Sequence, residues 1–343
     1  MTRRMGRRAA HWVRGVGLIL GLTLSAAIAA AEPKVVAVGL TVSDLASERA
    51  FFTEVLGFER GVERESMGEG TERLTGVFGA HTRSERLRLG AEEIELTEFL
   101  APRGRAIPAD SRSNDLWFQH IAIVVADMDA AYARLRQHGV RHVSSSPQRL
   151  PDWNPNAGGI RAFYFQDPDG HNLEIIWYPP GKGDPRWQTH VPGALFLGID
   201  HTAIAVRDSA ASLAFYRDVL GLHVAGTSEN WGSEQEHLNM VFGAHLKITG
   251  MRGAGGPGVE FLEYVAPAGG RPAPVEAAGN DLAHWQTVVE VEGLDAELAQ
   301  LSAAHGAAHA VSASAVALEA GNRGRRAAQV VDPDGHALLW VEP

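Results

Sequence analysis

The sequence repeats one pattern four times, and this repetition restricts the fold more than any other feature. Each repeat opens with a short apolar run of the kind that forms a strand: AVGLTVSD from Ala37, HIAIVVAD from His120, HTAIAVRD from His201 and HWQTVVEV from His284. The first three runs end in an Asp suited to cap a helix N-terminus. An amphipathic stretch follows each run, so every repeat predicts a strand and then a helix.

Each predicted helix is followed by further strand-like runs, which close with EEIELTEFLAP, HNLEIIWYP, PGVEFLEYVAP or HALLWVEP. The pattern predicts four β-α-β-β-β modules and an α+β fold. The motif VFGAH occurs only in modules one and three, and DPDGH only in modules two and four. This alternation indicates that a two-module unit was duplicated. We expect two halves, residues 32–182 and 194–343, joined by a Pro/Gly-rich linker at 183–193.

The DPDGH motif predicts a β-turn between the last two strands of a module, because Pro presets φ and Gly tolerates the bend that follows. We expect it to serve the fold and not the reaction. The residue four positions after its Gly differs between the two copies. It is Glu174 in module two and Leu339 in module four.

Strand alternation places the repeated histidines on an open face of each sheet. His120 shares a face with Ala122 and Val124, while the bulkier residues between them face the helix. His201 and Glu174 occupy similar positions in their own strands. A single buried histidine or glutamate is commonly structural. However, a buried carboxylate costs several kcal/mol unless it is paired or binds metal, and here histidine and glutamate recur together. The pattern therefore predicts a metal site.

The module order, the histidine at the start of a strand and the stretch FYFQDPDGHNLE resemble the vicinal oxygen chelate superfamily, which includes glyoxalase I, extradiol dioxygenases and bleomycin-resistance proteins. The resemblance covers residues 34–343. It implies paired modules that close into eight-stranded cups around one metal. It also implies that the ligands are the first residue of each opening strand and a Glu of each closing strand.

Carried over to this chain, the ligand positions are complete only in the two middle modules. Module one has Ala37 and Glu95, module two His120 and Glu174, module three His201 and Glu260, and module four His284 and Leu339. If modules pair in sequence, each cup lacks one ligand. If modules two and three pair, one cup holds His120, Glu174, His201 and Glu260. Cross-pairing explains why the losses fall on modules one and four, and we favour it.

The resemblance allows three functions. In a glyoxalase-like lyase or isomerase, a divalent metal (Ni, Zn, Fe, Mn or Co) would bind vicinal substrate oxygens, and Glu174 or Glu260 would act as general base. An extradiol dioxygenase is less favoured, because the segment DWNPNAGGI lacks that family's upstream histidine. A binding protein without catalysis is the third candidate. In that case Trp117, Trp153 or Trp231 could line a pocket, although each is more simply explained as a packing residue.

Composition limits the partners. The chain has no cysteine, which excludes disulfides and sulfur ligands. Five arginines and an apolar run precede Ala29-Ala30-Ala31, so residues 1–31 predict a signal peptide and a periplasmic or secreted protein; an uncleaved anchor is the alternative. Without those arginines the formal charge of −10 becomes −15. We therefore expect a small-molecule substrate, no nucleic acid and no internal membrane span, with a homodimer left open.

Overall fold

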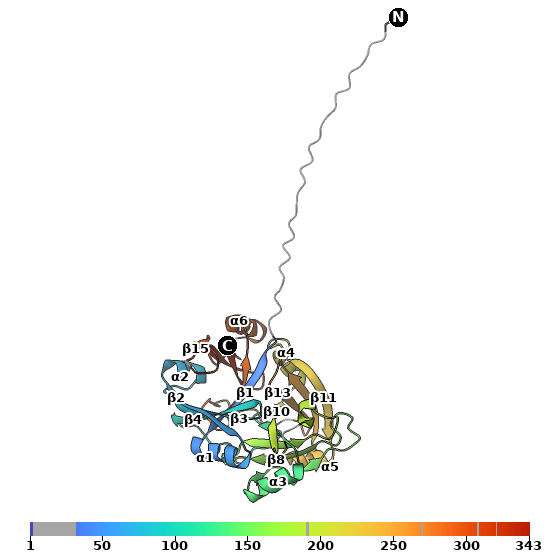
Figure 1. The fold of residues 1–343 in the computed structure, drawn as a ribbon. Helices are drawn as coiled ribbons and strands as arrows, with labels where there is room; N and C mark the ends of the chain where they lie inside the picture. Colours follow the sequence, from blue (N-terminus) through green and yellow to red (C-terminus); the bar gives the residue numbers. More distant parts are fainter. Residues whose placement is uncertain (3–31, 190–191, 269, 307–308, 320) are drawn as a thin grey trace. The chain divides into compact units, whose positions relative to one another are not determined.

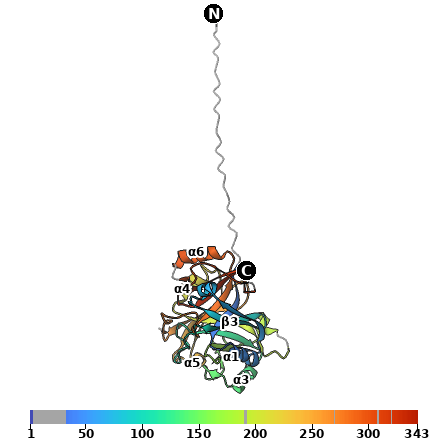
Figure 2. The same cartoon turned by 90° about the vertical axis from the view of Figure 1, so that its left-hand side faces the viewer.

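Two curved sheets carry the four modules (Figures 1 and 2). The computed structural model describes residues 1–2, 32–189, 192–268, 270–306, 309–319 and 321–343. The predicted signal peptide, apart from its first two residues, lies outside this range. The folded unit begins after residue 30, and the description below concerns that unit alone. Within the described residues, no helix is long and apolar enough to cross a membrane.

Modules one and three have the predicted strand and helix order, with a second helix before the third strand that the sequence pattern did not indicate. Module one contains β1 (Lys34–Val42), α1 (Leu45–Ala50), the π-helical turn η1 (Phe51–Val55), β2 (Glu59–Met67), α2 (Glu69–Thr75), β3 (His81–Leu89) and β4 (Glu92–Ala101). Module three contains β10 (Phe196–Val206), α4 (Ser209–Tyr216), β11 (His223–Trp231), α5 (Ser233–Asn239), β12 (His245–Arg252) and β13 (Gly258–Ala266).

Modules two and four are shorter, and their second strands are reduced to two-residue pieces. Module two contains β5 (Gln119–Val125), α3 (Met128–Gln137), β6 (Arg141–His142), β7 (Gln148–Arg149), β8 (Arg161–Gln166) and β9 (Asn172–Trp177). Module four contains β14 (Trp285–Glu290), α6 (Leu294–His305), β15 (Val316–Ala317), β16 (Arg326–Val331) and β17 (Ala337–Glu342). The predicted linker includes a short 3-10 helix, η2 (Pro185–Gln188).

The sheets confirm cross-pairing of the modules. One sheet runs β15-β16-β17-β14-β1-β4-β3-β2 and joins modules four and one through the antiparallel pair β1–β14. The other runs β11-β12-β13-β10-β5-β9-β8-β6 and joins modules three and two through β10–β5. Sequential pairing is therefore wrong. Each sheet takes one module from each of the two predicted halves, 32–182 and 194–343.

The hydrophobic cores, in contrast, largely follow the halves of the sequence. The helices of modules one and two pack into one buried cluster, which includes Phe52 and Leu135. Those of modules three and four pack into another, which includes Phe215 and Leu301. Accordingly, α1 and α3 lie at one end of the folded unit and α4 and α6 at the other (Figures 1 and 2). Each half thus supplies a core, and the two sheets tie the halves together.

The helix caps and the strand alternation predicted from the sequence are present in the structure. Asp44, Asp127 and Asp208 each accept a backbone N–H at the start of α1, α3 and α4, whereas α6 follows Gly293. In β10, Ile204 and Val206 pack in the core beneath α4, while the smaller Ala203 and Ala205 belong to a separate cluster. In β10, the predicted division into a helix-facing side and an open side is confirmed.

Both DPDGH motifs form the predicted turn, and both also link the two sheets. The Asp169 carboxylate accepts the backbone N–H of Ser43 at 2.6 Å, and that of Asp334 accepts the N–H of Arg207 at 2.8 Å. His171 is fully buried and lies 2.6 Å from Asp167. Burial opposes its charge, but Asp167 raises the pKa of His171 to about 9. The other ring nitrogen contacts the carbonyls of Thr41 and Leu282 across the interface.

Candidate metal centre

Cross-pairing brings together the four residues that the sequence marked as metal ligands. His120 and His201 lie on the adjacent strands β5 and β10, and Glu174 and Glu260 lie on β9 and β13. Across β10, Ala203 pairs with His120 on one side and with Glu260 on the other. The open faces of four neighbouring strands therefore converge on one point.

The distances at this point are those of a compact polar cluster. Glu174 Oε2 lies 3.0 Å from His120 Nε2 and 3.8 Å from His201 Nε2. Glu260 Oε1 lies 3.7 Å from His201 Nε2. One donor atom from each of His120, Glu174 and His201 falls within 4.8 Å of the others. This spacing allows a single ion to contact them all.

The hydrogen bonding of the cluster is incomplete in a way that suits a metal. Both ring nitrogens of His120 and Nε2 of His201 are buried and have no hydrogen-bond partner among the described residues. A buried polar atom left in this state costs about 1–3 kcal/mol. A divalent cation would satisfy Nε2 of both rings and neutralise the carboxylates. Nitrogen and oxygen donors without sulfur suit Ni, Zn, Fe, Mn or Co.

The electrostatics of the cluster also favour a cation. Burial raises the pKa of Glu260, and the nearby Glu174 carboxylate adds to this effect. Burial opposes the charge of His201, but Glu260 and Asp200 outweigh it and raise its pKa to about 9. The metal-free cluster therefore draws a proton onto an imidazole. A metal ion would compete for the same place.

Asp200 orients His201, and the sequence interpretation missed this residue. Its Oδ2 lies 2.9 Å from His201 Nδ1, an arrangement that leaves Nε2 directed at the metal position. Three further side chains donate to the same carboxylate: Tyr178 at 3.1 Å, Trp187 at 2.7 Å and Arg252 at 2.8 Å. These contacts and the His201 ring hold the pKa of Asp200 well below its usual range although burial opposes this.

A bulge in β10 explains why simple alternation did not find Asp200. Neighbouring residues in a regular strand point to opposite faces, so Asp200 and His201 should be separated. The β10–β5 register shifts between Ile199 and His201, which allows the two side chains to meet. Trp187 comes from the predicted linker, so that segment supports the site as well as joining the halves.

A cavity of about 360 Å³ opens from the cluster between the two middle modules. Glu174, His201 and Glu260 line it together with the charged Asp200 and Arg252. The other lining side chains include the uncharged polar groups of Asn156, Thr227, Ser228 and Asn230. Its size is within the range of small-molecule pockets, so a substrate could reach the metal position directly.

The other cup does not reproduce the cluster, and the predicted role of His284 needs correction. In that cup Gly39 pairs with Gln286, as Ala203 pairs with His120 in the first. Gln286 is therefore the counterpart of His120, and His284 lies two residues earlier. The sequence contained this information, because DLWFQH and DLAHWQ align on their shared Asp-Leu. Alignment of the modules on the histidines that open their strands places His284 opposite His120 and hides this offset.

The remaining positions of the second cup are equally poor in ligands. Ala37 and Leu339 offer no donor, and Glu95 is paired with Arg86 Nε at 3.2 Å. Within the described ranges, His120, Glu174 and His201 form the one group of three such residues close enough to share an ion. Among the residues that the structure describes, metal-binding geometry is thus found in the cup of modules two and three.

The three tryptophans suggested for a pocket behave differently from one another. Trp117 lines a pocket on the side of the second cup. Trp153 and Trp231 pack against each other at a tilt, with ring centroids 4.0 Å apart, and both remain nearly half exposed. The expectation of pocket lining therefore holds for Trp117 alone among the pockets found in the described residues.

Paired β-α-β-β-β modules, with histidine and glutamate on the open faces of their sheets, define the class of protein to which this chain belongs. The chain belongs to the Glyoxalase/Bleomycin resistance protein/Dioxygenase superfamily, whose family model matches residues 34–175 and 198–339. It is 41% identical over 150 residues to a 2-epi-5-epi-valiolone epimerase from Actinomyces, covering 42% of this chain and 79% of that protein.

One further sequence match and one structural match are to proteins named glyoxalase I. Glyoxalase I of Saccharomyces cerevisiae is 29% identical over 114 residues, which cover 33% of this chain and 31% of the yeast protein. The crystal structure of glyoxalase I from Zea mays aligns with a TM-score of 0.57 at 15% identity, covering 90% of this chain and 92% of the maize chain. At this identity the structural match supports the fold alone.

Proposed function

We propose that this protein is a glyoxalase-like lyase or isomerase that moves a proton on a small substrate bound to a divalent metal through vicinal oxygens. The observation that carries the proposal is the convergence of two histidines and two glutamates, of which His201, Glu174 and Glu260 line a cavity of about 360 Å³. The epimerase and glyoxalase I names of two relatives support an enzyme of this general kind.

His120, Glu174 and His201 would hold the metal, with Glu260 completing the set. A bound metal would supply Lewis acidity to the substrate oxygens. Asp200 keeps the His201 ring in place. The Tyr164 ring packs against His120 at a tilt, with ring centroids 4.7 Å apart, and limits movement of that ring. The rigid sheet thus fixes the ligands before substrate enters.

Glu260 is the better placed of the two glutamates to act as general base. Its side chain is 25% exposed toward the cavity, whereas that of Glu174 is 5% exposed and lies between the two histidines. Burial raises the pKa of Glu260, which brings the carboxylate nearer to the basicity that proton transfer requires. Glu260 would accept the substrate proton, and Glu174 would remain a ligand.

Metal reconstitution followed by three assays tests this proposal. The protein would be stripped of metal, loaded with Ni, Zn, Fe, Mn or Co, and assayed for hemithioacetal isomerisation, for exchange of a substrate carbon-bound proton with deuterated solvent, and for oxygen consumption with catechol. We expect proton exchange that depends on metal. Glu260→Gln should abolish exchange while keeping most of the bound metal, and Glu174→Gln should lose both.

Two outcomes would contradict the proposal. Metal-dependent oxygen uptake with catechol would indicate a dioxygenase. Tight metal binding with no turnover of any substrate would favour a binding protein. The periplasmic or secreted location remains a proposal of its own. Its test is the N-terminal sequence of the exported protein, which should begin near Glu32 if the signal peptide is removed.

A further inference from the structure

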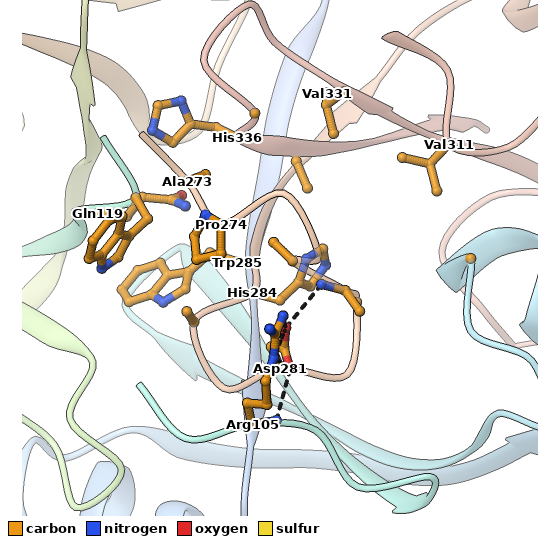
Figure 3. A pocket seen from close by; sticks show the side chains of 18 of the residues that line it. Arg105, Gln119, Ala273, Pro274, Asp281, His284, Trp285, Val311, Val331 and His336 are labelled. Atoms are coloured by element: carbon orange, nitrogen blue, oxygen red, sulfur yellow. Dashed lines mark hydrogen bonds and ion pairs between the residues drawn. The ribbon is translucent and has the colours of Figure 1, made fainter. Parts of the chain in front are cut away.

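A second pocket of about 300 Å³ lies where the cup of modules one and four meets the segments that connect the modules. We call it the second pocket and define it by Trp117, Pro274, His284, Trp285, Gln329 and Val331. Figure 3 shows His284 and Asp281 at its centre, with Trp285 and Pro274 beside them. It contains none of the four metal-cluster residues.

The floor of the second pocket is a chain of uncharged polar groups. Gln329 Nε2 lies 3.0 Å from His284 Nε2 and 3.4 Å from Gln286 Oε1. Gln329 is 3% exposed, and no described residue donates a hydrogen bond to its amide oxygen. Burial lowers the pKa of His284 to about 4, so the imidazole is neutral near pH 7. The floor therefore offers hydrogen bonding without charge.

The charges around the second pocket are paired with each other. Arg105 binds Asp281 through Nη2 at 2.6 Å and through Nε at 3.1 Å, and Asp281 also accepts the backbone N–H of Ala278. His336 Nδ1 lies 2.9 Å from Asp332, and the buried Nε2 of the same ring has no hydrogen-bond partner among the described residues. A charged ligand would find no unpaired counter-charge among the described lining residues. The walls are apolar and aromatic, formed by side chains such as Trp285, Pro274 and Val331.

The lining of the second pocket differs from that of the metal-binding cup at equivalent strand positions. Gln329 takes the place of Tyr164, since each lies opposite the ligand position of the closing strand, Leu339 or Glu174. A cup that had lost its metal and served only as scaffold would be most stable with an apolar, filled interior. This cup instead keeps a buried amide, an imidazole and an open cavity. Such an arrangement is typical of a small-molecule site.

We propose that the second pocket is a metal-independent binding site for a small uncharged molecule that carries a ring and a hydroxyl or amide donor. The ring packs between the apolar walls, and the donor bonds to the free amide oxygen of Gln329. The site is separate from the metal cluster, and the proposal does not depend on the reaction assigned to that cluster.

Binding of benzamide, with benzoate as its charged analogue, tests the proposal. Titration calorimetry and ligand-detected NMR would be run on metal-free and metal-loaded protein. We expect benzamide to bind equally with and without metal and about tenfold more tightly than benzoate. Gln329→Leu should weaken benzamide binding by about tenfold, because the amide donor is left unpaired. Val311→Trp, at a 40% exposed position on the pocket wall, should block entry without disturbing the core.

Glu174→Gln is the matched control, since it alters the metal cup alone and should leave benzamide binding unchanged. The proposal is overturned if Glu174→Gln abolishes binding, because the probe would then occupy the metal cup. It is also overturned if Gln329→Leu and Val311→Trp both bind benzamide like the wild type, or if benzamide shows no saturable binding. Folding of each variant is checked by thermal unfolding, and Val311→Trp keeps the test valid if Gln329→Leu is unstable.

Discussion

The two cups of this protein share one fold and differ in chemistry. At the four equivalent ligand positions, the first cup has His120, His201, Glu174 and Glu260, and the second has Gln286, Ala37, Leu339 and Glu95. Both nevertheless form sheets with the same central pairing. The comparison teaches that the helix-facing side of each strand builds the module and that the open side can gain or lose a metal site independently.

The largest effect should come from removing a histidine ligand. His120→Ala or His201→Ala should reduce bound metal from about one ion per chain to nearly none and lower turnover on the order of 10³-fold. Metal analysis after dialysis measures the first effect. The matched change in the second cup, Gln286→Ala, should leave metal content unaltered. Loss of metal in that variant would refute the assignment of one metal-binding cup.

A second test rebuilds the lost site. The triple variant Ala37→His, Gln286→His and Leu339→Glu restores the missing ligands beside Glu95. Without metal it should unfold more easily by several kcal/mol, because it buries new polar and charged groups. With metal it should recover stability and bind a second ion. A metal content that stays at one ion per chain would show that the cups differ in more than their ligands.

The buried DPDGH histidines predict how stability changes with pH. The pKa of His171 is about 9 in the folded protein against 6.5 when unfolded, so the folded state binds more protons between these values. Its contribution is complete below pH 6.5 and is lost as pH rises through 9, on the order of 3 kcal/mol. Urea unfolding at pH 6, 7.5 and 9 measures this decline. His171→Asn should reduce this decline without abolishing it, because the carboxylates around His201 raise its pKa to about 9 and burial raises the pKa of Glu48 to about 9. An unchanged slope would contradict the assignment.

A smaller loss of metal affinity should distinguish Asp200, which orients the His201 ring, from the residues that would bind the metal directly. Asp200→Asn should weaken metal binding about 10–100-fold, because the His201 ring loses its charged partner, while folding is retained. The second cup has Val36 at the corresponding position and no such support. Tyr178→Phe removes one of several donors to Asp200 and should change affinity only severalfold. Equal losses in the two variants would argue against a special role for Asp200. Metal titration with a competing chelator measures both.

Local patterns in the sequence were sufficient for the modules and the main ligands. The apolar alternation of HIAIVV and HTAIAV predicts strands with one open face, and the Asp residues that follow predict the helix starts. These features depend on neighbours a few residues apart, so they can be read from one sequence. His120, Glu174, His201 and Glu260 were found for this reason, with the resemblance supplying their common role.

Other features needed long-range contacts. The offset that makes Gln286, and not His284, the counterpart of His120 is visible in an alignment of the modules, but its meaning depends on the β1–β14 register. The pairing of Asp200 with His201 depends on a bulge that breaks strand alternation. Trp187 reaches Asp200 from a segment whose composition indicates only a linker.

The sequence by itself determined that four similar modules exist, that two carry complete ligand sets and that cysteine chemistry is excluded. The tertiary structure alone decided that modules pair across the halves, which joins the two complete ligand sets into one site and leaves the second cup without such a set. The pairing could not be read from the sequence because the edge of a β-strand can form hydrogen bonds with the edge of any strand of compatible pattern. The combined packing of sheets, helices and connecting segments decides which strands pair, and no short stretch of sequence specifies that packing.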